Sequence, residues 1–319
     1  MSRRSKQKGA ALLIVLLLAA TLSFLALATM ERTTTAASRA VNVNARGEAL
    51  WRAFAVETLS LAAVDDAVAR SNGRMSLDDP WAASPVELPF DGGGARVVFA
   101  DATACFNLNS LGAENNEAAA AEFVRLSESA GVSSFDATAL ADAIADWIDA
   151  DGARRPQGAE DEYYSILPSP YRTANQPFAS VTELRAIRGA TREVYAALKP
   201  YLCALPGTGP SPLNVNMLEE RHAPVLAAAL GDGASVQAAK DVIAARPPGG
   251  YATVDAFMGT PQVSALGASQ GQSRFAVTSA YVVARAEIVY DTALLEMTSE
   301  IAVQNGGSSV IARRIGAEE

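Results

Sequence analysis

The sequence predicts an α+β protein in which a long N-terminal helix packs on a small antiparallel sheet and a large helical domain is inserted. Three observations predict this fold class. Residues 10–64 contain no proline and a single glycine, Gly47, so one continuous helix of about 80 Å is expected. Residues 114–204 and 212–267 space their apolar side chains as helices do. Residues 275–303 alternate and are rich in Val, Ile and Tyr, which is typical of strands.

The beginning of the chain predicts a membrane anchor. Residues 10–30 are uncharged, and a run of about 20 such residues can cross the hydrocarbon core of a bilayer as a helix. The leader before them, residues 1–9, carries four basic residues, and positive charges of this kind stay on the cytoplasmic side. Everything after Met30 is therefore expected to be exported. A secretory cleavage site near residues 36–38 is an alternative end for the apolar segment.

Net charge argues against a nucleic-acid-binding protein. The 319 residues carry a formal net charge of −9, and removing the four positive charges of the leader leaves about −13. A protein that binds the phosphate backbone needs a basic face. We therefore expect no nucleic-acid partner.

The two cysteines, Cys105 and Cys203, are candidates for one disulfide. In an oxidising compartment this bond would close a loop of about 98 residues and stabilise the fold by roughly 4 to 5 kcal/mol on an entropy estimate. Two buried free thiols are the alternative. No Cys-x-x-Cys spacing points to a metal site.

Residues 95–100 predict a first strand that runs into a turn, where Asn107 and Asn109 are expected to cap the backbone locally. Two long strands joined as a hairpin and one edge strand then complete the sheet near the end of the chain. These three strands are expected at residues 275–290, 293–303 and 309–315.

Two helical modules are expected between the strands. Residues 114–204 are expected to be helical throughout, and Ser180 with Glu183 forms a capping box. Residues 212–267 predict helix, turn, helix, loop, helix. This arrangement resembles SAM-like and helix-hairpin-helix domains, and the latter grip DNA through hairpin amides that meet phosphate. Asp232 stands in the corresponding hairpin and would repel phosphate, so we expect a packing or protein-interaction role.

The densest polar cluster, residues 146–162, could bind calcium. Asp149, Asp151 and Glu160 fall at positions 1, 3 and 12 of an EF-hand count, but Arg154 stands where that loop needs glycine. The segment is therefore not an EF-hand. Carboxylates gathered in one flexible segment still suit Ca²⁺, which accepts irregular oxygen coordination. The alternative is a solvated acidic turn whose charge is offset by its two arginines.

The sequence contains no catalytic constellation. The only histidine, His222, has Arg221 before it and Pro224 two residues after it, and is expected at a helix start. No P-loop or histidine-rich metal motif occurs. Asp101 lies near Cys105 but lacks a base for a nucleophilic pair. We expect no enzymatic activity.

The leader and the apolar run, QKGAALLIVLLLAA, resemble those of type IV prepilins and type II secretion pseudopilins. In that family a prepilin peptidase cuts after the glycine, which implies cleavage between Gly9 and Ala10 and N-methylation of the new terminus. Most pilins carry glutamate at the fifth mature position, where this chain has Ile14. A carboxylate in lipid is costly unless it is paired. The absence of this glutamate is typical of K-type minor pseudopilins.

Further segments resemble motifs of the K-type minor pseudopilins of Gram-negative type II secretion systems, namely FNLN, DWIDAD, GAEDEYY, PYRTANQPFASVTELRAIRG, YAALKPYLCALP and PLNVN. The resemblance implies a pilin-like fold, an inner-membrane anchor and a periplasmic bulk. It implies a structural role at the pseudopilus tip, in a complex with the I and J minor pseudopilins, next to the major pseudopilin.

The resemblance also assigns a part to each segment of the chain. It implies a leader (1–9), a transmembrane part (10–30), a periplasmic helix with the first part of the head (31–109), a first module (110–211), a second module (212–267) and C-terminal strands of the head (268–319).

Members of that family bind calcium around the acidic segment. The resemblance therefore implies four calcium ligands, Asp149, Asp151, Glu160 and Asp161. Two further candidate ligands are Asp146 and Glu162. Two rival functions stay open from the sequence. One is a minor pilin of a type IV pilus or competence system that contacts DNA, and the other is a membrane-anchored periplasmic enzyme that uses the acidic loop.

Overall fold

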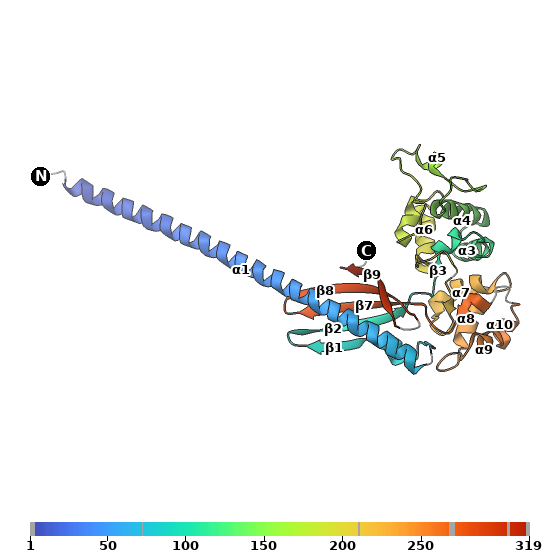
Figure 1. Ribbon diagram of the computed structural model, residues 1–319. Helices are drawn as coiled ribbons and strands as arrows, with labels where there is room; N and C mark the ends of the chain where they lie inside the picture. The colour runs from blue at the N-terminus through green and yellow to red at the C-terminus, as the bar shows by residue number, and fades with distance from the viewer. Residues whose placement is uncertain (1–3, 72, 210, 268–271, 305–306, 317–319) are drawn as a thin grey trace.

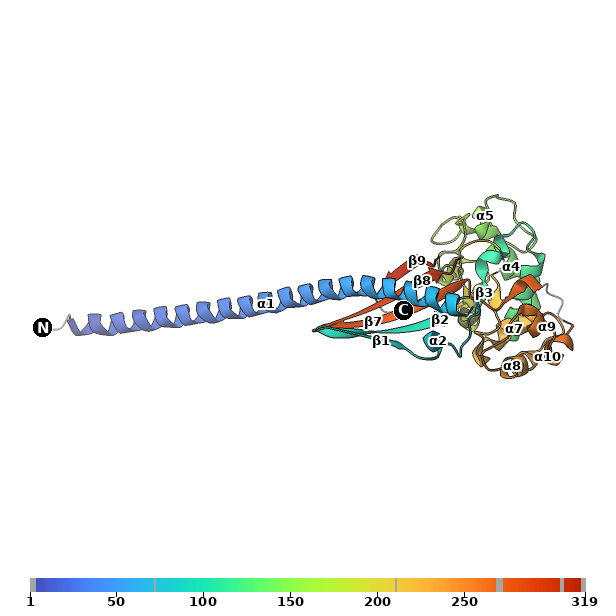
Figure 2. The same cartoon turned by 60° about the horizontal axis from the view of Figure 1, so that its bottom comes forward.

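A computed structural model places a long helix, a sheet and two helical modules one after another (Figure 1). The structure describes residues 4–71, 73–209, 211–267, 272–304 and 307–316. Both modules lie beyond the end of the sheet that is farthest from the N-terminus (Figures 1 and 2). The predicted mixture of a long helix, an antiparallel sheet and an inserted helical part is confirmed.

Helix α1 (Arg4–Arg70) has two halves with different surroundings. Its first half projects away from the molecule, and within the described residues this is the one helix that is long and apolar enough to cross a membrane. Its second half lies on the sheet and buries small apolar side chains there, namely Ala49, Ala53, Val56 and Val64. The helix predicted over residues 10–64 is confirmed and continues to Arg70.

The sheet has five antiparallel strands in the order β1-β2-β7-β8-β9. Alternate side chains face α1 and are buried, as in Val97 and Ile288, whereas Val98 and Val289 are exposed on the other face. The strands are β1 (Val86–Phe90), β2 (Gly93–Asp101), β7 (Tyr281–Tyr290), β8 (Ala293–Ala302) and β9 (Ser309–Ile315).

The edge strands show what the sequence predicts well and what it does not. The predicted edge strand over residues 309–315 is confirmed as β9. The proline-containing segment around Pro89 does not predict a strand, yet it forms β1. Proline fits there because β1 is the other edge of the sheet, where a missing N–H need not break a ladder.

The modules interrupt the sheet between β2 and β7. Each module is bracketed by a pair of two-residue parallel strands, which are β3 (Phe106–Asn107) with β4 (Leu202–Cys203) and β5 (Leu213–Asn214) with β6 (Phe275–Ala276). The prediction that the first hairpin strand begins at Phe275 is therefore wrong for the first residues of that strand. They pair with the chain that leads into the second module, and the hairpin begins at Tyr281.

The disulfide candidates Cys105 and Cys203 are joined in the structure, with Cα atoms 5.8 Å apart. Each cysteine lies beside or within the β3–β4 strand pair. The bond therefore closes the neck of the first module.

The expectation that residues 114–204 are helical throughout is wrong for residues 149–180. Apart from a single helical turn, this stretch is irregular. Four prolines at positions 156, 168, 170 and 177 remove donors and clash with a helical backbone. The first module contains α3 (Glu117–Ser129), α4 (Ser134–Ile148), α5 (Asp161–Tyr164) and α6 (Arg192–Leu198), with the 3₁₀ turns η1 (Leu108–Gly112), η2 (Val181–Ala186) and η3 (Lys199–Tyr201).

The second module follows the predicted order of helix, turn, helix, loop, helix. Its helices are short and its hairpin falls between α7 and α8. The elements are η4 (Glu220–His222), α7 (Ala223–Leu230), α8 (Val236–Ala244), α9 (Val254–Met258), α10 (Pro261–Ser264) and η5 (Gln272–Arg274). A further short helix, α2 (Pro80–Ala83), is outside the modules and precedes β1 in the chain.

The predicted capping box at Ser180 is confirmed. The Thr182 N–H donates to Ser180 Oγ, and Glu183 Oε1 accepts a hydrogen bond from the Ser180 N–H at 2.9 Å. The capped element is the short η2, which ends where Ile187 takes extended backbone angles. Gly189, with a positive φ of 87°, lies between η2 and α6.

The two modules share one apolar core, which is separate from the core between α1 and the sheet. A buried ion pair also joins them, since Glu122 of α3 contacts Arg274 of η5 at 2.8 Å and both side chains are less than a tenth exposed. The modules therefore form a single helical domain.

Candidate functional site

The acidic loop begins where α4 ends. Asp149 takes extended backbone angles after Ile148 and stops the helix. The chain then runs without regular structure to α5, at the outer edge of the first module (Figure 1). A long irregular loop within a compact domain usually serves a function.

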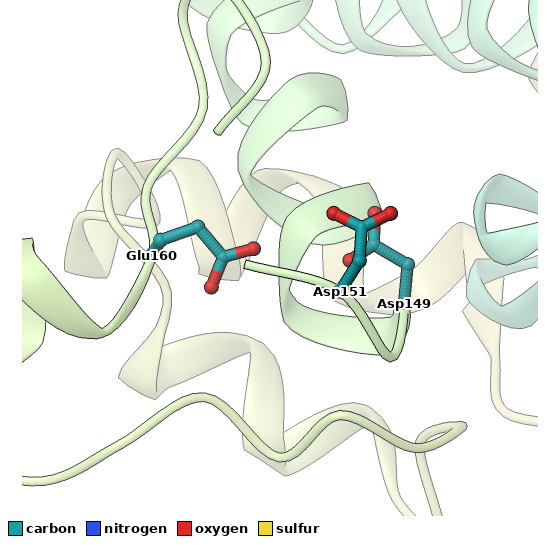
Figure 3. Close-up of side chains that lie close together, drawn as sticks. All are labelled: Asp149, Asp151 and Glu160. Atoms are coloured by element: carbon teal, nitrogen blue, oxygen red, sulfur yellow. The ribbon is translucent and has the colours of Figure 1, made fainter. Parts of the chain in front are cut away.

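Three carboxylates converge in this loop. Asp149, Asp151 and Glu160 each offer an oxygen, and these oxygens lie within 4.8 Å of one another. Figure 3 shows that Glu160 comes from the opposite side of the loop and points toward the two aspartates. Glu160 is only 6% exposed, whereas Asp151 is exposed. These three residues, from the six that the sequence singles out, form what we call the carboxylate cluster.

Two oxygens of the carboxylate cluster are buried without a hydrogen-bond partner among the described residues. They are Asp149 Oδ1 and Glu160 Oε1. Burial raises the pKa of Glu160, and the charges of Asp146 and Asp149 raise it further. A buried carboxylate oxygen without a donor is unfavourable, so the metal-free cluster carries an electrostatic cost.

A calcium ion fits this donor set. Carboxylate oxygens are the hard ligands that Ca²⁺ prefers, and flexible geometry around the ion is tolerated. A cation between Asp149 and Glu160 would give both orphaned oxygens a partner. When bound, such an ion would supply a positive charge that holds the two ends of the loop together.

Asp146 has a different environment from the carboxylate cluster. It is fully buried on α4, and its Oδ1 accepts a hydrogen bond from Arg155 Nη1 at 3.1 Å. Both of its oxygens also accept from the backbone N–H of Arg155 at 3.2 Å. A side chain at Gly158 would collide with Asp146 Oδ2, so the loop backbone packs directly on this carboxylate. Asp146 therefore anchors the loop to α4.

Asp161 and Glu162 also lie apart from the carboxylate cluster. Asp161 Oδ1 accepts hydrogen bonds from the N–H and the hydroxyl of Thr173, both at 2.9 Å, and these bonds lower the pKa of Asp161. Asp161 thus closes the later part of the loop. Glu162 is exposed on α5. The structure does not bring either residue into the cluster.

Aromatic side chains hold the loop against α4. Tyr164 of α5 packs edge-on against Trp147 of α4, with ring centroids 5.4 Å apart, and stacks on Tyr171 at 5.2 Å. Burial raises the pKa of Tyr164 to about 12. This packing fixes the position of Glu160, which immediately precedes α5.

Arg155 is the functional residue that the sequence reasoning missed. The sequence suggests only that it offsets charge in an acidic turn. Its Nη1 also donates to Asp149 Oδ2 at 2.6 Å, so one guanidinium joins the anchor Asp146 to the carboxylate cluster. The available signal was a single basic pair, Arg154 and Arg155, within the densest run of acids.

The remaining predicted positions lie away from the loop. Gly9 and Ala10 are within α1, whereas residues 1–3 of the leader lie outside the described residues. Asp232 pairs with Arg125 of α3 at 3.0 Å, so the hairpin faces the first module. His222 directly precedes α7, as expected, and burial lowers its pKa to about 4.

Comparison with known proteins identifies relatives over nearly the whole chain. Two family models, both described as type II secretion system protein K, match residues 104–207 and 213–278. Each match begins and ends near the strand pair that brackets one module.

Curated relatives and a solved structure agree with these matches. The type II secretion system protein K of Pectobacterium carotovorum is 34% identical over 89% of each chain. That of Klebsiella pneumoniae is 31% identical over 98% of this chain and 97% of its own. A chain in the crystal structure of the GspK-GspI-GspJ complex from enterotoxigenic Escherichia coli aligns with a TM-score of 0.73 and 28% identity, over 85% of this chain and 97% of that chain.

Proposed function

Because this chain belongs to the type II secretion system protein K family of minor pseudopilins, we propose that it caps the pseudopilus tip. In this proposal it joins the I and J minor pseudopilins and starts assembly of the fibre, which then grows from the major pseudopilin and serves protein export across the outer membrane. The solved relative that forms a complex with GspI and GspJ supports these two partners.

The tip position rests on one observation, the place of the two helical modules. They lie beyond the end of the sheet that is farthest from the membrane segment (Figure 2). In a fibre whose subunits stack along α1, modules of this size leave no room for another head above them. Ile14 supports the same position, because a glutamate within the membrane is useful only to a subunit that can pair it with a neighbour.

The proposal includes processing and location. The prepilin peptidase cleaves between Gly9 and Ala10, the new terminus is N-methylated, and residues 10–30 stay in the inner membrane with the bulk in the periplasm. The disulfide between Cys105 and Cys203 fits an oxidising compartment. Mass spectrometry of the mature N-terminus is expected to find Ala10, and an intact Met1 or a start near Arg39 would contradict the proposal.

The proposal also includes a structural calcium ion and no catalytic role. Asp149, Asp151 and Glu160 hold the ion, which orders the acidic loop of the first module. The support is the pair of orphaned buried oxygens and the all-carboxylate donor set.

The helical modules act as protein-interaction surfaces of the SAM-like or helix-hairpin-helix kind. A DNA-binding minor pilin of a type IV pilus or competence system is not favoured by the relatives reported above, which are described as type II secretion proteins. The pairing of Asp232 with Arg125 at the hairpin also opposes phosphate binding. We expect no shift in the electrophoretic mobility of DNA at moderate salt.

Immunogold electron microscopy tests the tip position. An epitope inserted at the exposed residues 114–115, between η1 and α3, would be expected to place gold at one end of each assembled pseudopilus. The same epitope on the major pseudopilin serves as the control and is expected to label the fibre along its length. Gold along the sides of fibres that carry the tagged K protein would overturn the tip position.

A further inference from the structure

We propose that Arg155 is a built-in counter-ion of the acidic loop, which keeps the calcium-free loop folded and weakens calcium binding to a set level. The inference rests on the calcium site proposed above. It assigns to Arg155, which is not a calcium ligand, a role in setting the calcium affinity.

The geometry places the guanidinium between the anchor and the cluster. Arg155 Nη1 contacts Asp146 Oδ1 at 3.1 Å and Asp149 Oδ2 at 2.6 Å. Asp146 is fully buried, Asp149 is 19% exposed and Arg155 is 29% exposed, so this ion pair is largely shielded from solvent. Breaking a shielded pair leaves an uncompensated charge, and the contact therefore stabilises the loop without metal.

Asp149 divides its two oxygens between two different cations. Its Oδ2 binds Arg155, whereas its Oδ1 is buried and has no partner among the described residues. A calcium ion can thus bind Oδ1 together with Asp151 and Glu160 while the guanidinium stays in place. In this arrangement only the Asp149 carboxylate would separate the calcium ion from the positive charge of Arg155.

That arrangement lowers calcium affinity through like-charge repulsion. The carboxylate cluster brings three negative charges to the site, and the charge of the anchor Asp146 also reaches Glu160. The guanidinium offsets part of this negative charge before calcium arrives. Charge count is a main determinant of calcium affinity in oxygen sites, and a unit charge acts strongly in a partly buried environment. Weak affinity suits a structural site outside the cytoplasm, where calcium is abundant.

Two roles for Arg155 predict opposite changes in affinity. If its charge opposes calcium, an uncharged side chain of similar length tightens calcium binding. If Arg155 only shapes the loop, its removal disorders the ligands and weakens calcium binding. The sign of the change therefore tests the inference.

The experiment uses the full chain in detergent micelles, stripped of metal and titrated calorimetrically with calcium chloride. We expect Arg155→Gln to bind calcium at least about tenfold more tightly than the unchanged chain. Its Tm without calcium is expected to fall by several degrees, and calcium is expected to raise that Tm more than in the unchanged chain. Arg154→Gln is the matched control, since it removes the same charge from an exposed neighbour, and its Kd is expected to stay within about threefold.

The outcomes separate this inference from the calcium site itself. If neither the unchanged chain nor Arg154→Gln binds calcium, the proposed site is absent and the inference falls with it. If both bind calcium and Arg155→Gln binds it equally or more weakly, only the inference is overturned. If Arg155→Gln fails to fold, Arg155→Lys decides, because it keeps the charge. A Kd within about threefold of the unchanged chain supports the inference, and a larger shift contradicts it.

Discussion

The side chain of Asn109 binds both backbone polar groups of Phe178. Its Oδ1 accepts a hydrogen bond from the Phe178 N–H at 2.7 Å, and its Nδ2 donates to the Phe178 carbonyl oxygen at 3.1 Å. Asn216 binds Tyr251 in the same way, at 2.7 Å and 2.9 Å. Both asparagines are buried. Each module thus uses one buried asparagine to hold a segment that is distant in the sequence.

The sequence repeats around these contacts. Residues 178–184 read FASVTEL and residues 251–257 read YATVDAF. The third residue of each segment, Ser180 or Thr253, caps the helix that follows, and the last residue of each is buried. The two modules are therefore built on one plan, and the acidic loop is an insertion into the first of them.

Replacing Asn216 with alanine is expected to destabilise the helical domain by about 2 to 4 kcal/mol, because a buried N–H and a buried carbonyl both lose their partner. Urea unfolding of the full chain in detergent micelles measures the change. Asn115→Ala is the control, since Asn115 is exposed, and its effect is expected to stay within about 0.5 kcal/mol. A cost below about 1 kcal/mol for Asn216→Ala would show that the contact adds nothing beyond a typical hydrogen bond.

The sequence predicts those parts of the fold that depend on local pattern. The long helix, the hairpin between β7 and β8, the edge strand and the capping box at Ser180 all have short-range signals, and all are confirmed. The strand pairs that bracket the modules have no such signal. Phe275 pairs with Leu213 because the segment that leaves the second module lies beside the segment that enters it.

The candidate site was predictable in its residue types but not in its arrangement. Six acids close together indicate a cation site, yet neighbouring acids in an irregular loop point in directions that tertiary contacts decide. Asp146 accepts a hydrogen bond from Arg155, and Asp161 accepts one from Thr173. The asparagines show the same limit, since Asn107 caps Asn109 locally as predicted, whereas the partner of Asn109 lies 69 residues away.

Glu57 is expected to couple α1 to the edge of the sheet. It accepts hydrogen bonds from Ser299 at 2.5 Å and from Arg313 Nε at 2.9 Å. Because Arg313 is 38% exposed, we expect Glu57→Gln to cost only about 1 to 3 kcal/mol at pH 7. Urea unfolding measures this cost, and Glu48→Gln, which breaks a surface pair with Arg52, is expected to cost less than about 0.5 kcal/mol.

The effect of Glu57→Gln is expected to depend on pH. Burial alone would raise the pKa of Glu57, but the hydrogen bonds from Arg313 and Ser299 and the charge of Arg313 outweigh it, and the pKa lies below its ordinary value of 4.5. A depressed folded-state pKa stabilises the protein above the unfolded value, and this stability is lost as pH falls through the folded value. The gap between Glu57→Gln and the unchanged chain should therefore narrow below pH 4.5, and a gap that widens in acid would contradict the assignment.

His222 gives a second pH dependence that needs no substitution to observe. Burial, with the charge of Arg221, lowers its pKa from 6.5 to about 4. The neutral ring is thus favoured in the folded state, so its contribution is present above pH 6.5 and is lost as pH falls through 4. The chain has one histidine, so proton NMR reports its ring without ambiguity. A measured pKa near 6.5 would show that the ring is solvated, and His222→Gln is expected to remove this part of the acid sensitivity.

The disulfide is expected to stabilise the neck of the first module. Replacing both Cys105 and Cys203 with serine should lower the free energy of unfolding by about 2 to 5 kcal/mol, because the bond closes a long loop in the unfolded chain. Unfolding in the presence and absence of a reductant supplies the control. The reductant should destabilise the unchanged chain by a similar amount and leave the double variant unaffected. Equal stability of the unchanged chain under both conditions would mean that the bond is not formed.

Calcium is expected to stabilise the full chain, by about 2.7 kcal/mol when its concentration is one hundred times the Kd. Differential scanning calorimetry with calcium or a chelator measures the shift in Tm. Asp151→Asn is expected to abolish the shift with little change in metal-free stability, because Asp151 is exposed. Glu160→Gln should also abolish it, but without lowering the metal-free Tm, since this variant removes a buried charge that has an unpartnered oxygen.

Asp146→Asn separates the anchor from the ligands in the same measurement. Because Asp146 holds Arg155 and the loop backbone, this variant is expected to lower the Tm with and without calcium, by several degrees. Glu162→Gln, at an exposed position on α5, is expected to keep both the Tm and the calcium shift. If Glu162→Gln loses the shift while Glu160→Gln keeps it, the ion is held elsewhere in the loop and the carboxylate cluster is not the calcium site.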